Sequence, residues 1–173
     1  MALITIYPTE PQDFGQVILA AEIASRLEEK TPIISRILDI LREERFINGD
    51  EEMQVRLCLD EAIINAMKHG NNFDEEKKVR IRVFADTYRW AIRIHDEGKG
   101  FTPEDVPDVN DPESLFLERG RGILLITEFM DQVWYYDGGR AVQLTKEKPT
   151  LGRKLARAPG KIWRKLKRWN PFG

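Results

Sequence analysis

The stretch Leu57–Asn72, LCLDEAIINAMKHGNN, is the part of the sequence from which the fold can be inferred most directly. It has the apolar periodicity of a helix, and it places an acid and an amide, Glu61 and Asn65, four residues apart. At about 100° per residue these two side chains and His69 fall on one face. The opposite face is apolar and consists of Val55, Leu59, Ile63, Ala66 and Met67. We expect a helix with its back in a core and polar groups on its open side, which by itself is also typical of a solvated helix.

Upstream of this helix, the sequence predicts a strand and another helix. Gln16–Ser25 is apolar with β-branched residues at its start, which favours a strand, although its alanines leave a helix open. Thr31–Pro32 predicts a helix start, with Thr as N-cap and Pro in the first turn. The turn Asn48–Asp50 is expected to end that helix, and Asp50 to cap the next one, which runs to Gly70.

Downstream, the apolar period changes from 3.6 to 2, which predicts strands. Two hairpins follow from this alternation: 79–83 with 90–95, and 133–136 with 141–145. Between the hairpins lie Asp96–Gly122, long enough for a functional loop, and a short apolar helix over Ile123–Met130. The expected fold class is α+β, a two-layer sandwich of a mostly antiparallel sheet with helices on one face.

Composition restricts the class of protein. The chain has 173 residues, 42% hydrophobic and 32% charged, as in an ordinary globular protein. Its single cysteine, Cys58, excludes an internal disulfide framework and predicts a buried free thiol. No apolar run reaches the roughly 18 residues that span a bilayer, and no secretory signal opens the sequence, so we expect a cytoplasmic protein.

The charge divides the chain into an acidic and a basic part. Residues 146–173 carry ten Lys or Arg and one acid, so that the remaining residues 1–145 have a net charge of −11. We therefore expect an N-terminal lead-in over 1–15, a domain over 16–146 and a basic tail over 147–173. Within the lead-in, Leu3–Tyr7 is either a short strand or an ordered approach to the sheet.

A second motif follows the predicted strand 90–95. Asp96-Glu97-Gly98-Lys99-Gly100 places a carboxylate at the strand end, followed by glycines that allow close backbone approach. A carboxylate in this position can accept a hydrogen bond from an exocyclic amine such as that of adenine. Alone, the motif also fits a Gly-rich turn with a turn-forming Asp.

A third motif, Arg119-Gly120-Arg121-Gly122, is expected as a loop that runs into a helix. Free N–H groups at a helix start, the helix dipole and two arginines all favour a phosphate. A flexible loop with solvated arginines would have the same sequence.

In this order and spacing, the three motifs resemble the ATP-binding domain shared by gyrase, histidine kinases, the ninety-kilodalton heat-shock chaperones and MutL, the GHKL superfamily. Leu57–Asn72 resembles its N-box, Asp96–Phe101 its first glycine box and Arg119–Ile123 its second. The segments DEAIINAMKHGN and GRGILLITEFMDQV are most similar to bacterial anti-sigma factor serine/threonine kinases. The resemblance covers about Val17–Lys146.

The resemblance implies ATP and Mg²⁺ as cofactors and a role for each matching residue. Asn65 matches the Mg²⁺ ligand, Glu61 the general base, and Asp96 the carboxylate that reads adenine. The matching nucleotide-lining glycines are Gly98, Gly100, Gly120 and Gly122. Arg119 and Arg121 compete for the phosphate-contacting arginine, because this loop is a residue shorter than in the family.

One position departs from the family. Members usually carry Gly-Thr in the last strand, with the Thr reaching adenine through water, whereas this chain has Gly139-Arg140. His69 receives no metal role, and the alternation does not settle which face His95 occupies.

The implied activity is an anti-sigma-type serine/threonine kinase. It would phosphorylate an anti-anti-sigma-like (STAS) partner, bind a sigma factor or analogous regulator, and order the Asp96–Gly120 loop on ATP binding. A homodimer stays open. The alternatives are a non-catalytic, nucleotide-gated partner-binding module and a simple GHKL-type ATPase.

The basic tail contains a short amphipathic segment, Lys161–Trp169, with apolar residues at i, i+1, i+4 and i+7. Basic side chains and interfacial Trp favour an anionic membrane surface or an acidic partner. Docking on the acidic domain itself is the alternative, and a nucleic-acid role has no further support. The localisation expected is thus cytoplasmic, with peripheral contact to the inner membrane surface left open.

Overall fold

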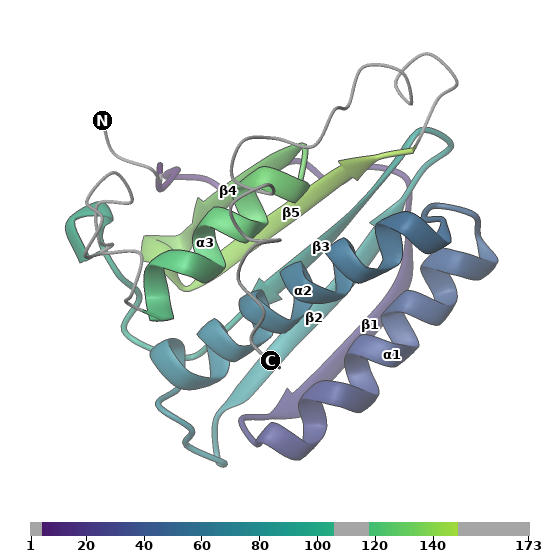
Figure 1. Ribbon diagram of the computed structural model, residues 1–173. Helices are drawn as coiled ribbons and strands as arrows, with labels where there is room; N and C mark the ends of the chain where they lie inside the picture. The colour runs from purple at the N-terminus through teal and green to yellow at the C-terminus, as the bar shows by residue number, and fades with distance from the viewer. Residues whose placement is uncertain (1–4, 106–117, 149–173) are drawn as a thin grey trace.

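The computed structural model describes residues 5–105 and 118–148, without the side chains of residues 104 and 118–121. These residues form one five-stranded antiparallel sheet, in the order β1-β2-β3-β5-β4, with its helices on one face (Figure 1). The elements are β1 (Gln16–Ala24), α1 (Leu27–Glu43), α2 (Gly49–Asn65), β2 (Lys78–Ala85), β3 (Arg89–His95), α3 (Glu118–Phe129), β4 (Gln132–Tyr136) and β5 (Ala141–Glu147). The predicted α+β sandwich is confirmed, and the segment predicted as a strand over Gln16–Ser25 is β1, Gln16–Ala24, rather than a helix.

β3 lies at the centre of the sheet and carries the Asp96 motif at its end. Ile94 pairs with Ile81 of β2 and with Val142 of β5, and all three are buried. Because side chains alternate along a strand, these apolar groups face the helices together. The register therefore delivers Asp96 to one end of the helix-covered face, beside the turn between β4 and β5.

α1 begins five residues earlier than the sequence predicted. Its N-cap is Arg26, and Pro32 lies inside the helix, so Thr31 is not the cap. Glu28 and Glu29 occupy the first turn, where the helix dipole favours negative charge. Pro32 removes one backbone hydrogen bond, but burial of the later apolar stripe (Ile33, Ile34, Ile37, Leu38 and Leu41) outweighs that loss.

The start of α2 also differs from the prediction. Asn48, not Asp50, is the N-cap, and it forms a capping box with Glu51: its side chain accepts the N–H groups of Asp50 and Glu51. At the other end, regular α-helix stops at Asn65 and a π-helical turn, Ala66–Gly70, follows. The Asn71 N–H accordingly bonds to the Ala66 carbonyl, five residues back. The 100° spacing thus applies to Glu61 and Asn65, whereas His69 lies in the wider turn.

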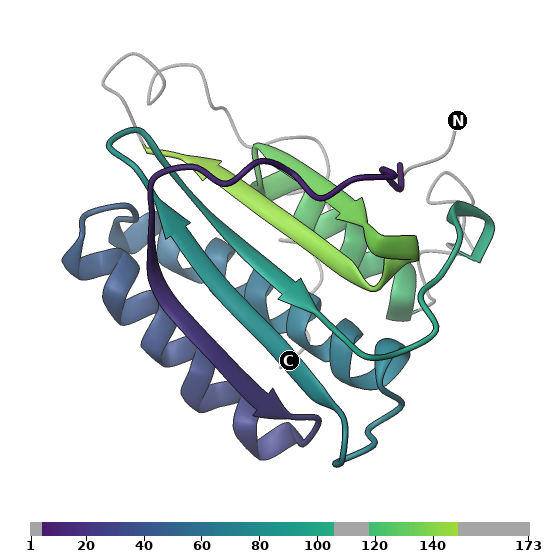
Figure 2. The same cartoon turned by 180° about the vertical axis from the view of Figure 1, so that it is seen from behind.

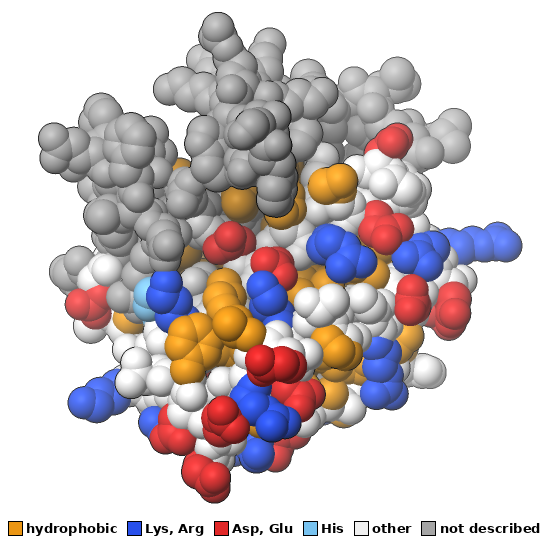
Figure 3. All heavy atoms as spheres, turned by 60° about the horizontal axis from the view of Figure 1, so that its bottom comes forward, with side chains coloured by type: hydrophobic (Ala, Val, Ile, Leu, Met, Phe, Trp, Pro, Cys, Tyr) orange, Lys and Arg blue, Asp and Glu red, His pale blue; other side chains and the backbone are white. Residues whose placement is uncertain are grey.

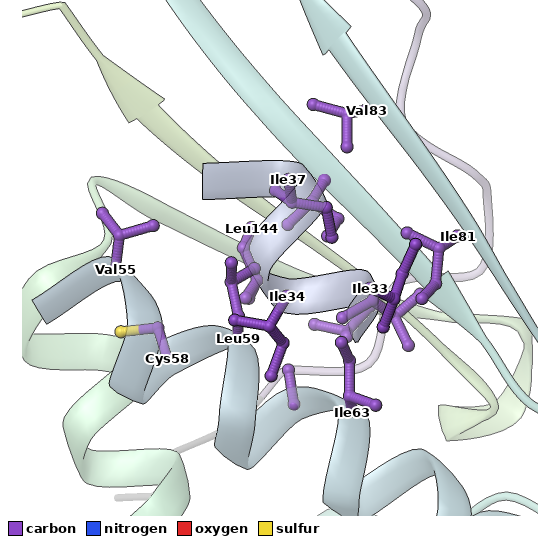
Figure 4. Packing of buried hydrophobic residues seen from close by; sticks show 14 of the residues in the cluster. Ile33, Ile34, Ile37, Val55, Cys58, Leu59, Ile63, Ile81, Val83 and Leu144 are labelled. Atoms are coloured by element: carbon purple, nitrogen blue, oxygen red, sulfur yellow. The ribbon is translucent and has the colours of Figure 1, made fainter. Parts of the chain in front are cut away.

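The core lies between the sheet and the helices. Figure 4 shows side chains from α1, α2, β2 and β5 interdigitating in this layer. The predicted apolar back of α2 and its π-helical turn is confirmed, because Val55, Leu59, Ile63, Ala66 and Met67 are all buried. Cys58 is a buried free thiol, and burial raises its pKa to about 12.

The opposite face of the sheet is partly covered by residues 7–14, which we call the N-terminal strap (Figure 2). Its anchor is Arg93, which is 4% exposed and bonds to Glu10, Asp13 and the Pro11 carbonyl. Ile6, just before the strap, forms a bridge with β4.

The surface carries acidic and basic side chains next to one another (Figure 3). Ion pairs join Lys30 to Asp60 at 2.8 Å and Arg42 to Glu52 at 3.0 Å. Exposed pairs of this kind contribute little to stability. Within residues 5–105 and 118–148, no helix combines the length and the apolar character that a bilayer crossing requires.

Asn71 ties four parts of the fold together. Its side chain is fully buried, and its Nδ2 donates to Ser25 Oγ at 2.7 Å and to the Lys78 carbonyl at 3.0 Å. Its Oδ1 accepts the Glu97 N–H at 2.7 Å. One amide thus connects the end of β1, the start of β2, the π-helical turn and the loop after Asp96.

Replacing Asn71 with Ala is expected to destabilise the fold by about 2–4 kcal/mol, because three buried or half-buried groups lose their partner. Urea unfolding measures this. Asn72→Gly is the matched control: Asn72 is exposed with φ 55°, which Gly tolerates. Equal stability of the Asn71→Ala and Asn72→Gly variants would contradict the role of Asn71.

Candidate nucleotide-binding site

An open pocket lies between α2 with its π-helical turn, the end of β3 and the start of β5. It encloses about 590 Å³ of empty space, including its mouth. It is lined by Ala62, Asn65, Ala66, His69, Gly70, Ile94, Asp96, Gly100, Phe101, Ile123, Tyr135, Gly139, Arg140, Ala141 and Val142. Most of this wall is apolar, and a few polar groups converge on it, as in small-molecule sites.

Among the described residues that line this pocket, Asp96 is the acidic one, and it is only 8% exposed. Its Oδ1 accepts the Gly98 N–H at 2.8 Å, and its own N–H donates to the Arg140 carbonyl at 3.0 Å. Burial raises the pKa of Asp96, although the Gly98 N–H and the nearby His95 and Arg140 act in the opposite direction. An acceptor held in this way suits a partner that donates a hydrogen bond, such as an amine.

The glycines near Asp96 allow chain segments to approach each other closely. A Cβ on Gly70 would collide with the Asp96 carboxylate, and one on Gly98 would collide with the Gly70 carbonyl. The end of the π-helical turn therefore packs directly on the Asp96 loop. Gly98 contacts the Asp96 carboxylate from outside the pocket wall, whereas Gly100 lines the pocket itself.

The β4–β5 turn packs against the same loop. The Phe101 N–H bonds to the Gly138 carbonyl at 3.1 Å, and a Cβ on Gly100, where φ is +76°, would collide with that carbonyl. Gly139, at φ +87°, lies against the Phe101 backbone in turn. Left-handed conformations suit glycine, so both positions need it.

α2 supplies the remaining predicted side chains. Asn65 lines the pocket, and its amide makes no hydrogen bond within the part of the chain that the structure describes. Glu61 lies one turn earlier, outside the pocket wall. A Cβ on Gly122 would collide with the Glu61 carboxylate, so α3 packs closely on this acid. The structure thus brings Asn65, Asp96 and Gly100 together, with Glu61 and Gly122 meeting beside them.

The second glycine motif differs from its prediction. Arg119-Gly120-Arg121-Gly122 belongs to α3, which spans Glu118–Phe129, rather than to a loop before a helix at Ile123. The side chains of Arg119 and Arg121, and residues 106–117 of the expected ATP-ordered loop, lie outside what the structure describes. The tail beyond Lys148, with Lys161–Trp169, also lies outside it.

Sequence reasoning did not assign a site role to several residues near the pocket. Gly70 and Arg140 line it, and Asn71 holds the Asp96 loop. His95 contacts Asp137 at 2.8 Å through Nε2, and it is not part of the pocket wall. Gly70 and Asn71 directly follow His69 in the motif Leu57–Asn72, and this position in the sequence is the signal that could have indicated their place near the pocket. For Arg140, the signal was its departure from Gly-Thr.

The residues present fit a purine nucleotide. Asp96 offers a buried acceptor in an apolar pocket, and the side-chain carbonyl of Asn65 is a hard oxygen donor of the kind that Mg²⁺ prefers. The two groups come from different elements and face one cavity, as recognition of a base at one end and of phosphates at the other requires.

Comparison with known proteins agrees with this geometry. Residues 23–146 match the histidine kinase-like ATPase domain family. The chain is 34% identical over 106 residues to the anti-sigma F factor of Anoxybacillus flavithermus, an alignment that covers 56% of this chain and 70% of that protein. The anti-sigma F factor of Bacillus subtilis gives the same figures.

The serine-protein kinase RsbW of Listeria monocytogenes is 28% identical over 99 residues, covering 53% of this chain and 63% of its own length. The matched region runs from the end of β1 through α1 and all later elements to the penultimate residue of β5. The chain therefore belongs to the histidine kinase-like ATPase domain family, in the branch that includes the anti-sigma F factors and the serine-protein kinase RsbW.

Proposed function

We propose that this protein is an ATP-dependent serine/threonine kinase of the anti-sigma type. It phosphorylates an anti-anti-sigma-like (STAS) partner and binds a sigma factor or an analogous regulator. The observation that carries the proposal is the convergence of Asp96 and Asn65 on one apolar pocket, with Glu61 one helical turn away. Membership of the anti-sigma branch supports it.

In this mechanism each side chain has one task. Asp96 accepts a hydrogen bond from the adenine amine, while the apolar wall excludes water from the base. The partner hydroxyl attacks the γ-phosphorus, the bond from that phosphorus to the bridging oxygen breaks, and Glu61 accepts the hydroxyl proton.

Asn65 would hold magnesium through its side-chain oxygen, and the ion would supply charge neutralisation during transfer. Gly98 and Gly100 hold the loop at the base, whereas Gly120 and Gly122, with Arg119 or Arg121, are proposed at the phosphate end. The start of α3 supports this, because Gly122 lies against Glu61.

The other parts of the chain have proposed roles as well. Residues 16–146 form the kinase domain, 1–15 lead into it, and 147–173 form the basic tail. We propose that Lys161–Trp169 binds an anionic membrane surface, because its basic and Trp side chains fit a lipid interface. The kinase would then act in the cytoplasm at the inner membrane surface.

Replacing Glu61 with Gln is expected to reduce phosphate transfer from labelled ATP to the partner on the order of 10²–10⁴-fold, because the general base is lost. ATP binding should persist, as measured by calorimetry. Asp60→Asn is the matched control, since the Asp60 carboxylate pairs with Lys30 at 2.8 Å instead.

Transfer that survives Glu61→Gln would remove this residue from the mechanism. ATP binding without transfer by the wild type would favour a nucleotide-gated module, and phosphate release to water without any partner would favour a simple ATPase.

Asn65→Ala should weaken ATP binding in the presence of magnesium but change little in its absence.

Replacing Asp96 with Asn is expected to weaken ATP binding about 10–100-fold, because a donor would then face the adenine amine. The binding by wild type should weaken as pH falls through the raised pKa of Asp96, since the protonated carboxyl accepts less well. Glu97→Gln, a neighbouring exposed acid, serves as control. Unchanged affinity in Asp96→Asn would contradict base recognition by this carboxylate.

Stability should show the opposite pH sense. Because the pKa of Asp96 is raised in the folded protein, the folded state holds the proton more tightly than the unfolded chain. The free energy of unfolding of the wild type, measured relative to that of the Asp96→Asn variant, should therefore fall as pH rises. The fall should span the interval between the ordinary pKa of an Asp side chain and the raised pKa of Asp96. Urea titrations across that interval measure it, and a parallel pH dependence in both proteins would contradict it.

Deleting Leu151–Gly173 is expected to abolish cosedimentation with vesicles containing anionic lipid, because the interfacial Trp and basic residues are removed. Neutral vesicles are the control for charge. If the intact protein does not sediment with anionic vesicles, the membrane role is wrong.

A further inference from the structure

Arg140 lies at the base end of the proposed nucleotide pocket. It lines the cavity, and its carbonyl accepts the Asp96 N–H at 3.0 Å. Its side chain lies against the Asp96 loop, because a Cβ on Gly100, which lines the same cavity, would come within 3.4 Å of Arg140 Cγ. The Arg140 side chain therefore begins beside the loop that carries the Asp96 carboxylate.

The neighbouring turn holds the Arg140 side chain in place. Nη2 donates to Asp137 Oδ1 at 2.5 Å, and Nε donates to the Asp137 carbonyl at 3.2 Å. Asp137 is itself fixed, because its Oδ2 contacts His95 Nε2 at 2.8 Å. This chain of contacts anchors the guanidinium beside the pocket.

The guanidinium retains donors after this anchoring. Of its five N–H groups, those on Nε and Nη2 face Asp137, while Nη1 makes no hydrogen bond within the residues that the structure describes. Arg140 is also close enough to Asp96 for its charge to favour the ionised carboxylate against the effect of burial. One end of the pocket therefore presents a fixed acceptor and a fixed donor.

Adenine has the complementary pattern on its edge. Its exocyclic amine is a donor, and a ring nitrogen on either side of that amine, N1 or N7, is an acceptor. A carboxylate that accepts from the amine leaves one of these ring nitrogens facing a donor placed beside it. Arg140 is the charged donor-only side chain lining the pocket next to Asp96 among the described residues.

We propose that Arg140 is a second base-recognition residue, which donates to a ring nitrogen of adenine while Asp96 accepts from the amine, and that Asp137 is its positioning residue. This inference rests on the proposed function, because it requires ATP in the pocket. It adds a direct contact at the position where this chain departs from the Gly-Thr of its family.

The experiment compares the affinities of ATP, 1-deaza-ATP and 7-deaza-ATP by calorimetry. These triphosphates share every phosphate contact and differ only in one ring nitrogen. Wild type should bind one deaza analogue about 10-fold more weakly than ATP, the effect of one charge-assisted hydrogen bond. Arg140→Met, of similar length but without donors, should bind ATP about 10-fold more weakly and lose the discrimination between ATP and that analogue.

Two further variants separate the contact from a general effect of charge or folding. Arg140→Lys keeps the charge without the planar fork, and should recover only part of the discrimination. Asp137→Asn keeps a residue that tolerates the φ of 53° there, removes the anion that holds Arg140, and should reduce the discrimination without abolishing ATP binding. Arg140 is partly exposed, with a side-chain accessibility of 43%, so unchanged thermal midpoints are expected.

Equal ratios of ATP to analogue affinity in wild type and Arg140→Met would overturn the inference, as would equal binding of all three nucleotides by wild type. Either result leaves ATP binding, and with it the proposed function, standing. Absence of ATP binding by the wild type would instead refute the proposed function and this inference together.

Discussion

The buried Asn71 amide is the interaction on which the geometry of the site depends. It joins β1, β2 and the π-helical turn. Its Oδ1 also accepts the N–H of Glu97, the residue after Asp96, at 2.7 Å. Each such hydrogen bond has a net value of only about 1 kcal/mol, but a buried partner left unpaired costs more. The amide is therefore a positional constraint above all: it sets where the strand of Asp96 ends relative to the helix that carries Asn65.

Around this constraint, the pocket is built by close approach of backbone to backbone. The π-helical turn packs on the Asp96 loop at Gly70 and Gly98, and the β4–β5 turn packs on it at Gly100. The loop is thus held from two sides, and the Asp96 carboxylate keeps its direction despite the cost of burial, which raises its pKa. The ionised Asp96 carboxylate is destabilised by burial, and a hydrogen bond from a bound ligand would offset that cost. Buried titratable groups of this kind are typical of functional sites.

The same packing explains why this chain can keep the fold of the histidine kinase-like ATPase domain family and still carry Arg140 at a position where members usually have Thr. The β4–β5 turn is fixed by its backbone contacts to Phe101, so the side chain that follows it can vary without moving the loop. Asp137 takes up two of the arginine donors and keeps the guanidinium near the base end. The fold thereby separates the part of the site that must be constant from a position that can adjust recognition.

The sequence by itself determined the sheet strands, the apolar back of α2 and the motifs that carry Asn65 and Asp96, because period and motif spacing are local properties. It did not determine helix ends: Thr31–Pro32 and Asp50 are good local start signals, yet packing extended α1 to Leu27 and the capping box selected Asn48. The π-helical turn, the partners of Asn71 and the orientation of Arg140 were decided only by tertiary structure. They depend on contacts between segments far apart in sequence, which no local pattern encodes.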